Sequence, residues 1–199
     1  SRGLGDVYKR QALNGLAFDG PDGCAGTCAA VQAIGSPMRK LRRGDLVLMD
    51  IPAGLLGYHT DKSVVYYYGK LDEHPHAALI REAYDLCARI EREAAAALKT
   101  GALPEEIYLD AVSKVPEQLQ AGFMMGGKFL GHSIGLTMDE APVLAKSFRT
   151  PLESGMTFAI EPKIALDGIG MVGTENTYRV TETGGVSLTG EILPLIEIG

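Results

Sequence analysis

The chain has 199 residues, of which 46% are hydrophobic and 22% charged, and its formal net charge at pH 7 is −6. This composition predicts one folded domain and argues against a general phosphate-binding surface, so we expect no nucleic-acid partner. No apolar run approaches the roughly 18 residues of a membrane-spanning helix, so we expect no membrane partner. The three cysteines include no CxxC pair, which favours a reducing compartment and predicts a cytoplasmic protein.

The first eleven residues, "SRGLGDVYKRQ", are polar and basic, and they show no periodicity. They resemble the read-through leader that begins many translated environmental sequences, so we expect residues 1–11 to be non-native. We expect the folded domain to span residues 12–199 and to be incomplete at its N-terminus. A first strand is predicted at 13–20, closed by the turn sequence "DGPDG".

Strands and helices then follow in a recognisable order. Apolar and aromatic runs predict strands at about 45–51 and 58–68, joined by a hairpin connection. Apolar residues at helical spacing predict a long helix that ends before Gly101, and a second helix from Pro104 to about Leu119. Short strands are expected around 129–132, 156–161, 169–172 and 175–181. This order predicts an α+β domain with antiparallel pairing.

Two aspartates stand in this predicted sheet. Asp50 directly follows "LVLM" and Asp61 precedes "SVVYYY", eleven residues later. A buried carboxylate is costly unless it is paired or bound to a cation. If the two strands pair, both side chains can converge on one point. Taken alone, however, two strand-end aspartates that cap turns explain the pattern better.

Three further segments change that balance. His132 lies in "KFLGHSIGL", Glu161 ends the strand "MTFAIEP", and Glu175 lies within "MVGTENTYRV". Each has an ordinary structural explanation, such as a hydrogen-bonded core histidine or a glutamate paired to lysine. Together, however, four carboxylates and one imidazole suit two divalent cations of the Mn, Co, Fe or Zn type.

The ordered set "GDLVLMD", "GYHTD", "GHSIGL", "DEAP", "FAIEP" and "GTENTYRVTETGG" resembles the M24 family of metallopeptidases. The resemblance covers about residues 13–190 and is closer to the Xaa-Pro aminopeptidase and prolidase branch than to methionine aminopeptidase. It implies the pita-bread (creatinase/aminopeptidase) fold, in which helices cover the outer face of a curved antiparallel sheet. It also implies a hydrolase with a metal-bridging hydroxide, a small peptide substrate and a homodimer of the full-length protein. The implied metal ligands are Asp50, Asp61, His132, Glu161 and Glu175, with Glu161 also as proton shuttle.

Two positions depart from the family pattern. Seven residues after His132, where these peptidases carry a second histidine, this chain has Asp139; Gln32 stands where another histidine is usual. A carboxylate cannot donate a hydrogen bond unless it is protonated. Asp139 can instead anchor a substrate ammonium or act as a base. This favours, as an alternative, a non-peptidase of the same fold, such as a lyase or amidohydrolase acting on a small zwitterionic compound. A third reading is a binding module without catalysis.

Overall fold

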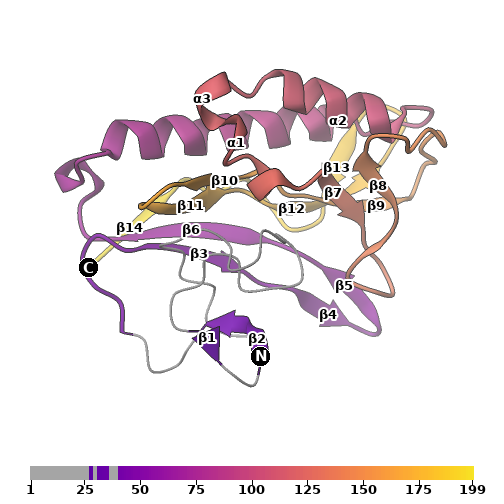
Figure 1. The fold of residues 1–199 in the computed structure, drawn as a ribbon. Helices are drawn as coiled ribbons and strands as arrows, with labels where there is room; N and C mark the ends of the chain where they lie inside the picture. The colour runs from indigo at the N-terminus through magenta and orange to yellow at the C-terminus, as the bar shows by residue number, and fades with distance from the viewer. Residues whose placement is uncertain (1–26, 29–30, 36–39) are drawn as a thin grey trace.

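The computed structural model describes residues 27–28, 31–35 and 40–199 of the chain (Figure 1). The expected leader at 1–11 and the expected strand at 13–20 therefore lie outside the described residues. Two short strands, β1 (Thr27–Cys28) and β2 (Val31–Gly35), pair with each other in antiparallel fashion. Gln32 falls within β2, but its side chain is not among those described.

The helices lie together on one side of the strands (Figure 1). In α1 (Ala77–Ala97), the residues at helical spacing form one buried stripe, which includes Ile80, Cys87 and Ile90. None of the described helices is both long and apolar enough to cross a membrane. The remaining helices are η1 (Leu71–Glu73), α2 (Pro104–Ser113), α3 (Glu117–Gln120) and η2 (Met124–Gly126).

The extent predicted for the second helix is wrong. The structure ends α2 at Ser113 and begins α3 at Glu117, so the expected single helix from 104 to 119 is two helices. Pro116 separates them because its ring nitrogen carries no hydrogen and its ring clashes with the preceding turn of an α-helix. The start at Pro104 agrees with the prediction, as a proline is well tolerated in the first helical turn.

A five-stranded antiparallel sheet forms the largest group of paired strands, in the order β13-β12-β9-β7-β8. Three of its strands lie where strands are predicted, whereas the sequence reading missed the two edge strands. The bounds of the five strands are β7 (Phe129–Ser133), β8 (Glu140–Ala145), β9 (Thr157–Ile160), β12 (Asn176–Val180) and β13 (Gly185–Ser187).

A second sheet carries the two aspartate-bearing segments. Its order is β14 (Ile196–Ile198), β6 (Ser63–Tyr68), β3 (Leu46–Asp50), with β3 antiparallel and β14 parallel to β6. The predicted strand at 58–68 is two strands, because β5 (Tyr58–Thr60) instead pairs with β4 (Ala53–Leu55). The register places Asp50 opposite Ser63, so the predicted pairing of the two segments is confirmed.

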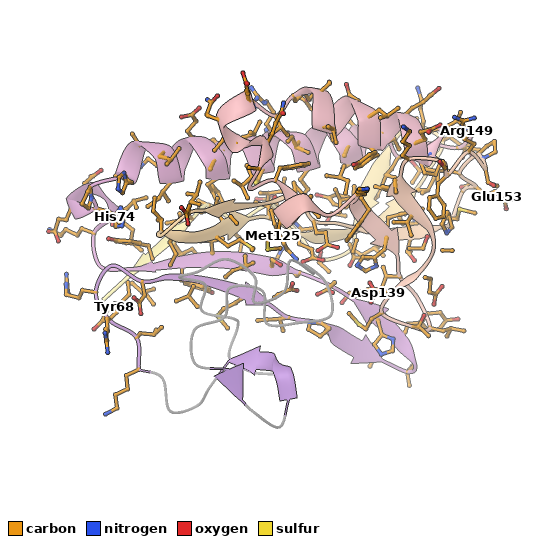
Figure 2. All side chains as sticks on the ribbon, viewed as in Figure 1. Tyr68, His74, Met125, Asp139, Arg149 and Glu153 are labelled. Atoms are coloured by element: carbon orange, nitrogen blue, oxygen red, sulfur yellow. The ribbon has the colours of Figure 1, made fainter. Side chains whose placement is uncertain are left out.

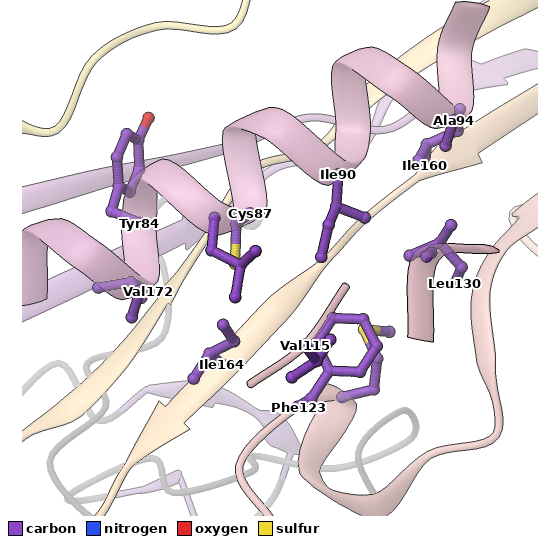
Figure 3. Close-up of a cluster of buried hydrophobic side chains, with 14 of the residues drawn as sticks. Tyr84, Cys87, Ile90, Ala94, Val115, Phe123, Leu130, Ile160, Ile164 and Val172 are labelled. Atoms are coloured by element: carbon purple, nitrogen blue, oxygen red, sulfur yellow. The ribbon is translucent and has the colours of Figure 1, made fainter. Parts of the chain in front are cut away.

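The core lies between α1 and the hairpin of β10 (Lys163–Leu166) and β11 (Gly170–Gly173). Figure 3 shows Cys87 of α1 above Ile164 and Val172 of this hairpin, all three fully buried. Side chains fill the space between the helices and the strands (Figure 2). The expected α+β class with antiparallel sheets is confirmed, and its core fixes the strands whose ends carry the polar residues.

Candidate metal centre

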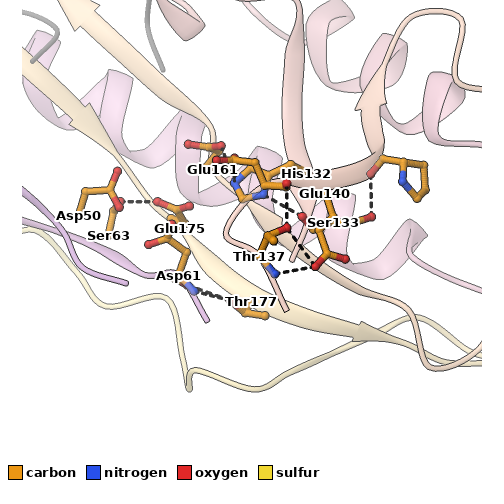
Figure 4. A network of polar contacts seen from close by, with 12 residues as sticks. Asp50, Asp61, Ser63, His132, Ser133, Thr137, Glu140, Glu161, Glu175 and Thr177 are labelled. Carbon is orange, nitrogen blue, oxygen red and sulfur yellow. Dashed lines mark hydrogen bonds and ion pairs between the residues drawn. The ribbon is translucent and has the colours of Figure 1, made fainter. Parts of the chain in front are cut away.

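The five residues expected as metal ligands come from five separate segments of the chain. Asp50 ends β3, Asp61 lies between β5 and β6, and His132 lies in β7. Glu161 directly follows β9, and Glu175 directly precedes β12. Figure 4 shows their side chains directed toward a common region at the ends of these strands. Each of the five side chains therefore lies at, or within one residue of, the end of a strand.

Backbone pairing explains how the segments meet. His132 pairs with Ala159 of β9, which brings it beside Glu161. Ser63 forms an isolated bridge with Glu175, which joins the aspartate-bearing sheet to the larger one. The approach of β7 to β9 requires Gly131, because a Cβ atom there would lie 2.1 Å from the carbonyl oxygen of Ala159.

Asp61, His132 and Glu175 form the tightest group. One potential ligand atom from each lies within 4.8 Å of the others, and the three residues are 9%, 6% and 1% exposed. Donors bonded at about 2.1 Å to one tetrahedrally coordinated cation are about 3.4 Å apart, so a gap of 4.8 Å has to close by about 1.4 Å, shared between two side chains. Sub-ångström side-chain movements would therefore let the three groups bind a single divalent ion.

Glu161 completes one side of this group. Its Oε1 lies 3.4 Å from Nε2 of His132 and has no hydrogen-bond partner, although the side chain is buried. A buried carboxylate oxygen without a partner carries a desolvation cost that a bound cation would offset. The donor set of Asp61, His132, Glu175 and Glu161 therefore fits a divalent metal of the Mn, Co, Fe or Zn type.

Asp50 lies on the other side, where Lys163 also reaches the cluster. Nζ of Lys163 lies 2.8 Å from Oδ2 of Asp50, 2.6 Å from Oε2 of Glu161 and 3.2 Å from Oε2 of Glu175. The sequence reading missed Lys163. No local pattern marked it, because Glu161 follows β9 whereas Lys163 opens the next strand, β10.

Thr177 fixes the backbone at Asp61. The Asp61 N–H donates to Oγ1 of Thr177 over 2.8 Å, and that hydroxyl donates to the Asp61 carbonyl oxygen over 3.0 Å. Ser63 holds Glu175 in a similar way, as its hydroxyl donates to Oε2 over 2.6 Å. Neither residue was predicted, because each contact joins segments more than 100 residues apart.

We expect Thr177→Val to weaken Mn²⁺ binding by about 10- to 100-fold, the usual cost of losing a group that orients a metal ligand. Valine keeps the shape but leaves the Asp61 N–H without its acceptor. Thr177→Ser keeps the hydroxyl and should retain most of the affinity. Calorimetric titration of both variants with Mn²⁺ measures the difference, and equal affinities for the two would contradict this role.

Burial dominates the electrostatics of the centre. It raises the pKa of Glu161 and Glu175, and burial together with neighbouring Asp50 raises the pKa of Asp61 to about 8. For Asp50 burial acts in the same direction, but the Lys163 ammonium and hydrogen bonds from Lys163, Asp61 and Glu175 together outweigh it and lower the pKa. Burial would lower the pKa of Lys163, yet the surrounding carboxylates raise it. One ammonium is thus not enough positive charge for all four carboxyl groups of the cluster to be ionised at the same time.

These shifts predict how the metal-free protein responds to pH. A carboxyl whose pKa rises from about 4 in the unfolded chain favours the folded state while it is protonated. The free energy of unfolding should therefore fall as the pH rises toward about 8, the pKa of Asp61. Urea unfolding in a chelator checks this against Asp61→Asn, which should show a smaller fall. Equal pH dependence in both proteins would contradict the assignment to Asp61.

Asp139 lies at the open side of the centre. Its Oδ1 is 3.3 Å from Nε2 of His132, while 67% of its side chain is exposed. Figure 2 places it near the β4–β5 hairpin. The other ring nitrogen of His132 lies 3.1 Å from the Ser133 carbonyl oxygen. Asp139 therefore places an exposed carboxylate beside a buried member of the cluster.

Comparison with known proteins identifies clear relatives. The model of metallopeptidase family M24 matches residues 3–182. The Xaa-Pro dipeptidase of Pyrococcus furiosus is 30% identical over 151 residues, covering 76% of this chain and 41% of that protein. The probable dipeptidase PepE of Mycobacterium tuberculosis is 32% identical over 151 residues, covering 75% of this chain and 38% of that protein.

The fold has equally clear counterparts. The crystal structure of dipeptidase PepE from Mycobacterium ulcerans superposes with a TM-score of 0.73 at 29% identity, over 83% of this chain and 43% of that one. The expected family fold is therefore supported by structure as well as by sequence. The chain spans about two fifths of the length of the curated relatives named above.

Proposed function

The chain belongs to metallopeptidase family M24, and on that premise we propose that it supplies the catalytic centre of a metal-dependent peptidase that cleaves Xaa-Pro bonds. The relatives named Xaa-Pro dipeptidase and dipeptidase PepE support this substrate class. The observation that carries the proposal is the convergence of Asp61, His132 and Glu175 within 4.8 Å. We also propose that the domain has the pita-bread fold, in which the antiparallel sheet is curved.

The residues that would hold a divalent cation are Asp61, His132, Glu175 and Glu161. When bound, such a cation lowers the pKa of water and polarises a carbonyl group, which is the chemistry that amide hydrolysis needs. The second cation implied by the family resemblance would need Asp50 as a ligand. We propose a small peptide as the substrate, a homodimer for the full-length protein and a cytoplasmic location.

Glu161 is the residue we assign to proton transfer. Its buried Oε1 has no hydrogen-bond partner, and burial raises its pKa toward the range useful for acid–base work. The carboxylate would accept a proton from the attacking water while the oxygen of that water bonds to the substrate carbonyl carbon. It would return that proton to the amine nitrogen as the C–N bond breaks. His132 holds its place beside Glu161 through β7–β9 pairing.

A substrate panel tests the proposed function. The purified chain, supplied with Mn²⁺ or Co²⁺, should hydrolyse Xaa-Pro dipeptides or longer Xaa-Pro peptides faster than matched Xaa-Ala peptides. A chelator should abolish the activity, and the metal should restore it. Turnover that survives chelation, or faster cleavage of the Xaa-Ala peptides, would contradict the proposal.

The second candidate function rests on Asp139. An exposed carboxylate 3.3 Å from His132 can anchor a small cationic or zwitterionic compound, which suits a non-peptidase lyase or amidohydrolase. In the same panel, turnover of a sulfonium or cyclic amidine compound without peptide cleavage would favour this alternative. Affinity for ligands without any turnover would instead favour a binding module.

Asp139 itself should face the substrate. Asp139→Asn removes one negative charge, and we expect kcat/KM to fall by about 10- to 100-fold, since hydrogen bonds to charged groups contribute about 1.5–3 kcal/mol. Asp110→Asn is the control, because Asp110 lies on α2 and pairs with Lys114. An unchanged kcat/KM for Asp139→Asn on the best substrate found would show that this carboxylate does not contact the substrate.

A further inference from the structure

Lys163 is a buried cation inside the candidate metal centre. It opens β10, directly opposite Gly173 of β11, and its side chain is 7% exposed. A Cβ atom at Gly173 would lie 2.7 Å from Cγ of Lys163, so the aliphatic part of the lysine crosses the space that this glycine leaves open. The hairpin is therefore built to lay the lysine side chain toward the carboxylates.

The ammonium group has a complete set of partners. A lysine ammonium has three hydrogens to donate, and three carboxylates surround this one. The nearest oxygens, at 2.8, 2.6 and 3.2 Å from Nζ, belong to Asp50, Glu161 and Glu175. Beside these contacts, Asp61, His132 and Glu175 bring ligand atoms within 4.8 Å of one another, and Asp61 also neighbours Asp50. The cluster thus already contains one cation, the Lys163 ammonium, next to the group that could bind a metal ion.

A second divalent cation would compete with the Lys163 ammonium for Asp50, Glu161 and Glu175. It would have to bond oxygens of the same carboxylates at about 2.0–2.2 Å, and one oxygen of each already lies within 3.2 Å of the ammonium. It would also lie beside a like charge in a buried place, where repulsion is weakly screened. Two divalent ions with Lys163 would exceed the charge of the four carboxylates, whereas one ion with Lys163 does not.

We propose that the Lys163 ammonium takes the place of one of the two cations expected from the family resemblance, so that the centre binds a single divalent ion per chain. That ion lies with Asp61, His132, Glu175 and Glu161, while Asp50 serves as the counter-ion of Lys163. This inference rests on the proposed metal-dependent function. It assigns Lys163 as a positioning residue and predicts one ion where the family resemblance implies two.

Metal counting tests the inference. The full chain is stripped with a chelator, reloaded with excess Mn²⁺, desalted and analysed for metal and protein content. Wild type should retain about one ion, and Lys163→Met, which removes the charge but keeps the length, should retain about two. Lys62→Met is the matched control, because its ammonium contacts Asn176 and the Glu191 carbonyl oxygen, and it should retain one.

Each outcome decides the matter. Two ions in wild type, or one ion in folded Lys163→Met, would overturn the inference while leaving the metal-dependent function intact. No ion in wild type would overturn both. Should Lys163→Met not fold, the electron paramagnetic resonance spectrum of Mn²⁺-loaded wild type decides alone. An isolated Mn²⁺ signal supports one ion, and exchange coupling between two ions about 3.5–4 Å apart overturns it.

Discussion

Glu161→Gln should lower kcat/KM for an Xaa-Pro peptide by about 10²–10⁴-fold, the usual contribution of a positioned acid–base group. Glutamine keeps the shape of the side chain but cannot accept and return a proton. Glu161 suits this role because its Oε1 is buried, has no hydrogen-bond partner and lies 3.4 Å from Nε2 of His132. Steady-state kinetics with metal-loaded protein gives the ratio directly.

Metal content separates the two roles that Glu161 can have. If proton transfer is its main contribution, Glu161→Gln should lose activity while it still retains metal. Glu105→Gln is the control for the chemical change, since Glu105 pairs with Arg149 and the Ser147 N–H away from the centre. Loss of activity in exact proportion to loss of metal would assign Glu161 to metal binding alone. Near-wild-type activity would remove it from the mechanism.

Asp61→Asn should have the largest effect on metal binding. Asp61 is 9% exposed and lies in the group with His132 and Glu175, and an amide is a poorer ligand than a carboxylate for these cations. We expect Mn²⁺ affinity to fall by more than the roughly 100-fold that loss of an outer-shell partner can cost. Activity at micromolar Mn²⁺ should fall with it, and both are measurable by titration.

The matched control is Asp72→Asn, an exposed aspartate that pairs with Arg81 near the start of α1. It removes the same charge and should change neither Mn²⁺ affinity nor activity. High Mn²⁺ concentrations should restore part of the activity of Asp61→Asn, because the remaining ligands still converge. Unchanged Mn²⁺ affinity in Asp61→Asn would show that the ion binds elsewhere.

Much of the fold could be predicted from local pattern. The strand ending at Asp50 carries a continuous apolar run and the long helix α1 carries helical periodicity, and the structure has both close to the predicted bounds. Pro116 stands inside the helix predicted to run to about Leu119, and its effect as a helix breaker was not taken into account. The edge strands β8 and β13 were missed because edge strands are set by pairing with their neighbours more than by composition.

The candidate site was predictable in its residues but less so in its arrangement. The five polar positions could be named because buried carboxylates are costly and because their motifs resemble a family. The role of Lys163 could not be read locally, since it depends on how the β10–β11 hairpin faces β3. The contact between Asp61 and Thr177 likewise spans 116 residues and appears only in the folded chain.

The most direct test of the account is anomalous diffraction from crystals of the chain grown or soaked in Mn²⁺. We predict an anomalous peak at about 2.0–2.2 Å from ligand atoms of Asp61, His132 and Glu175. A fully occupied peak at some other position, or no peak near these three side chains at saturating Mn²⁺, would contradict the claim that this cluster is a metal centre.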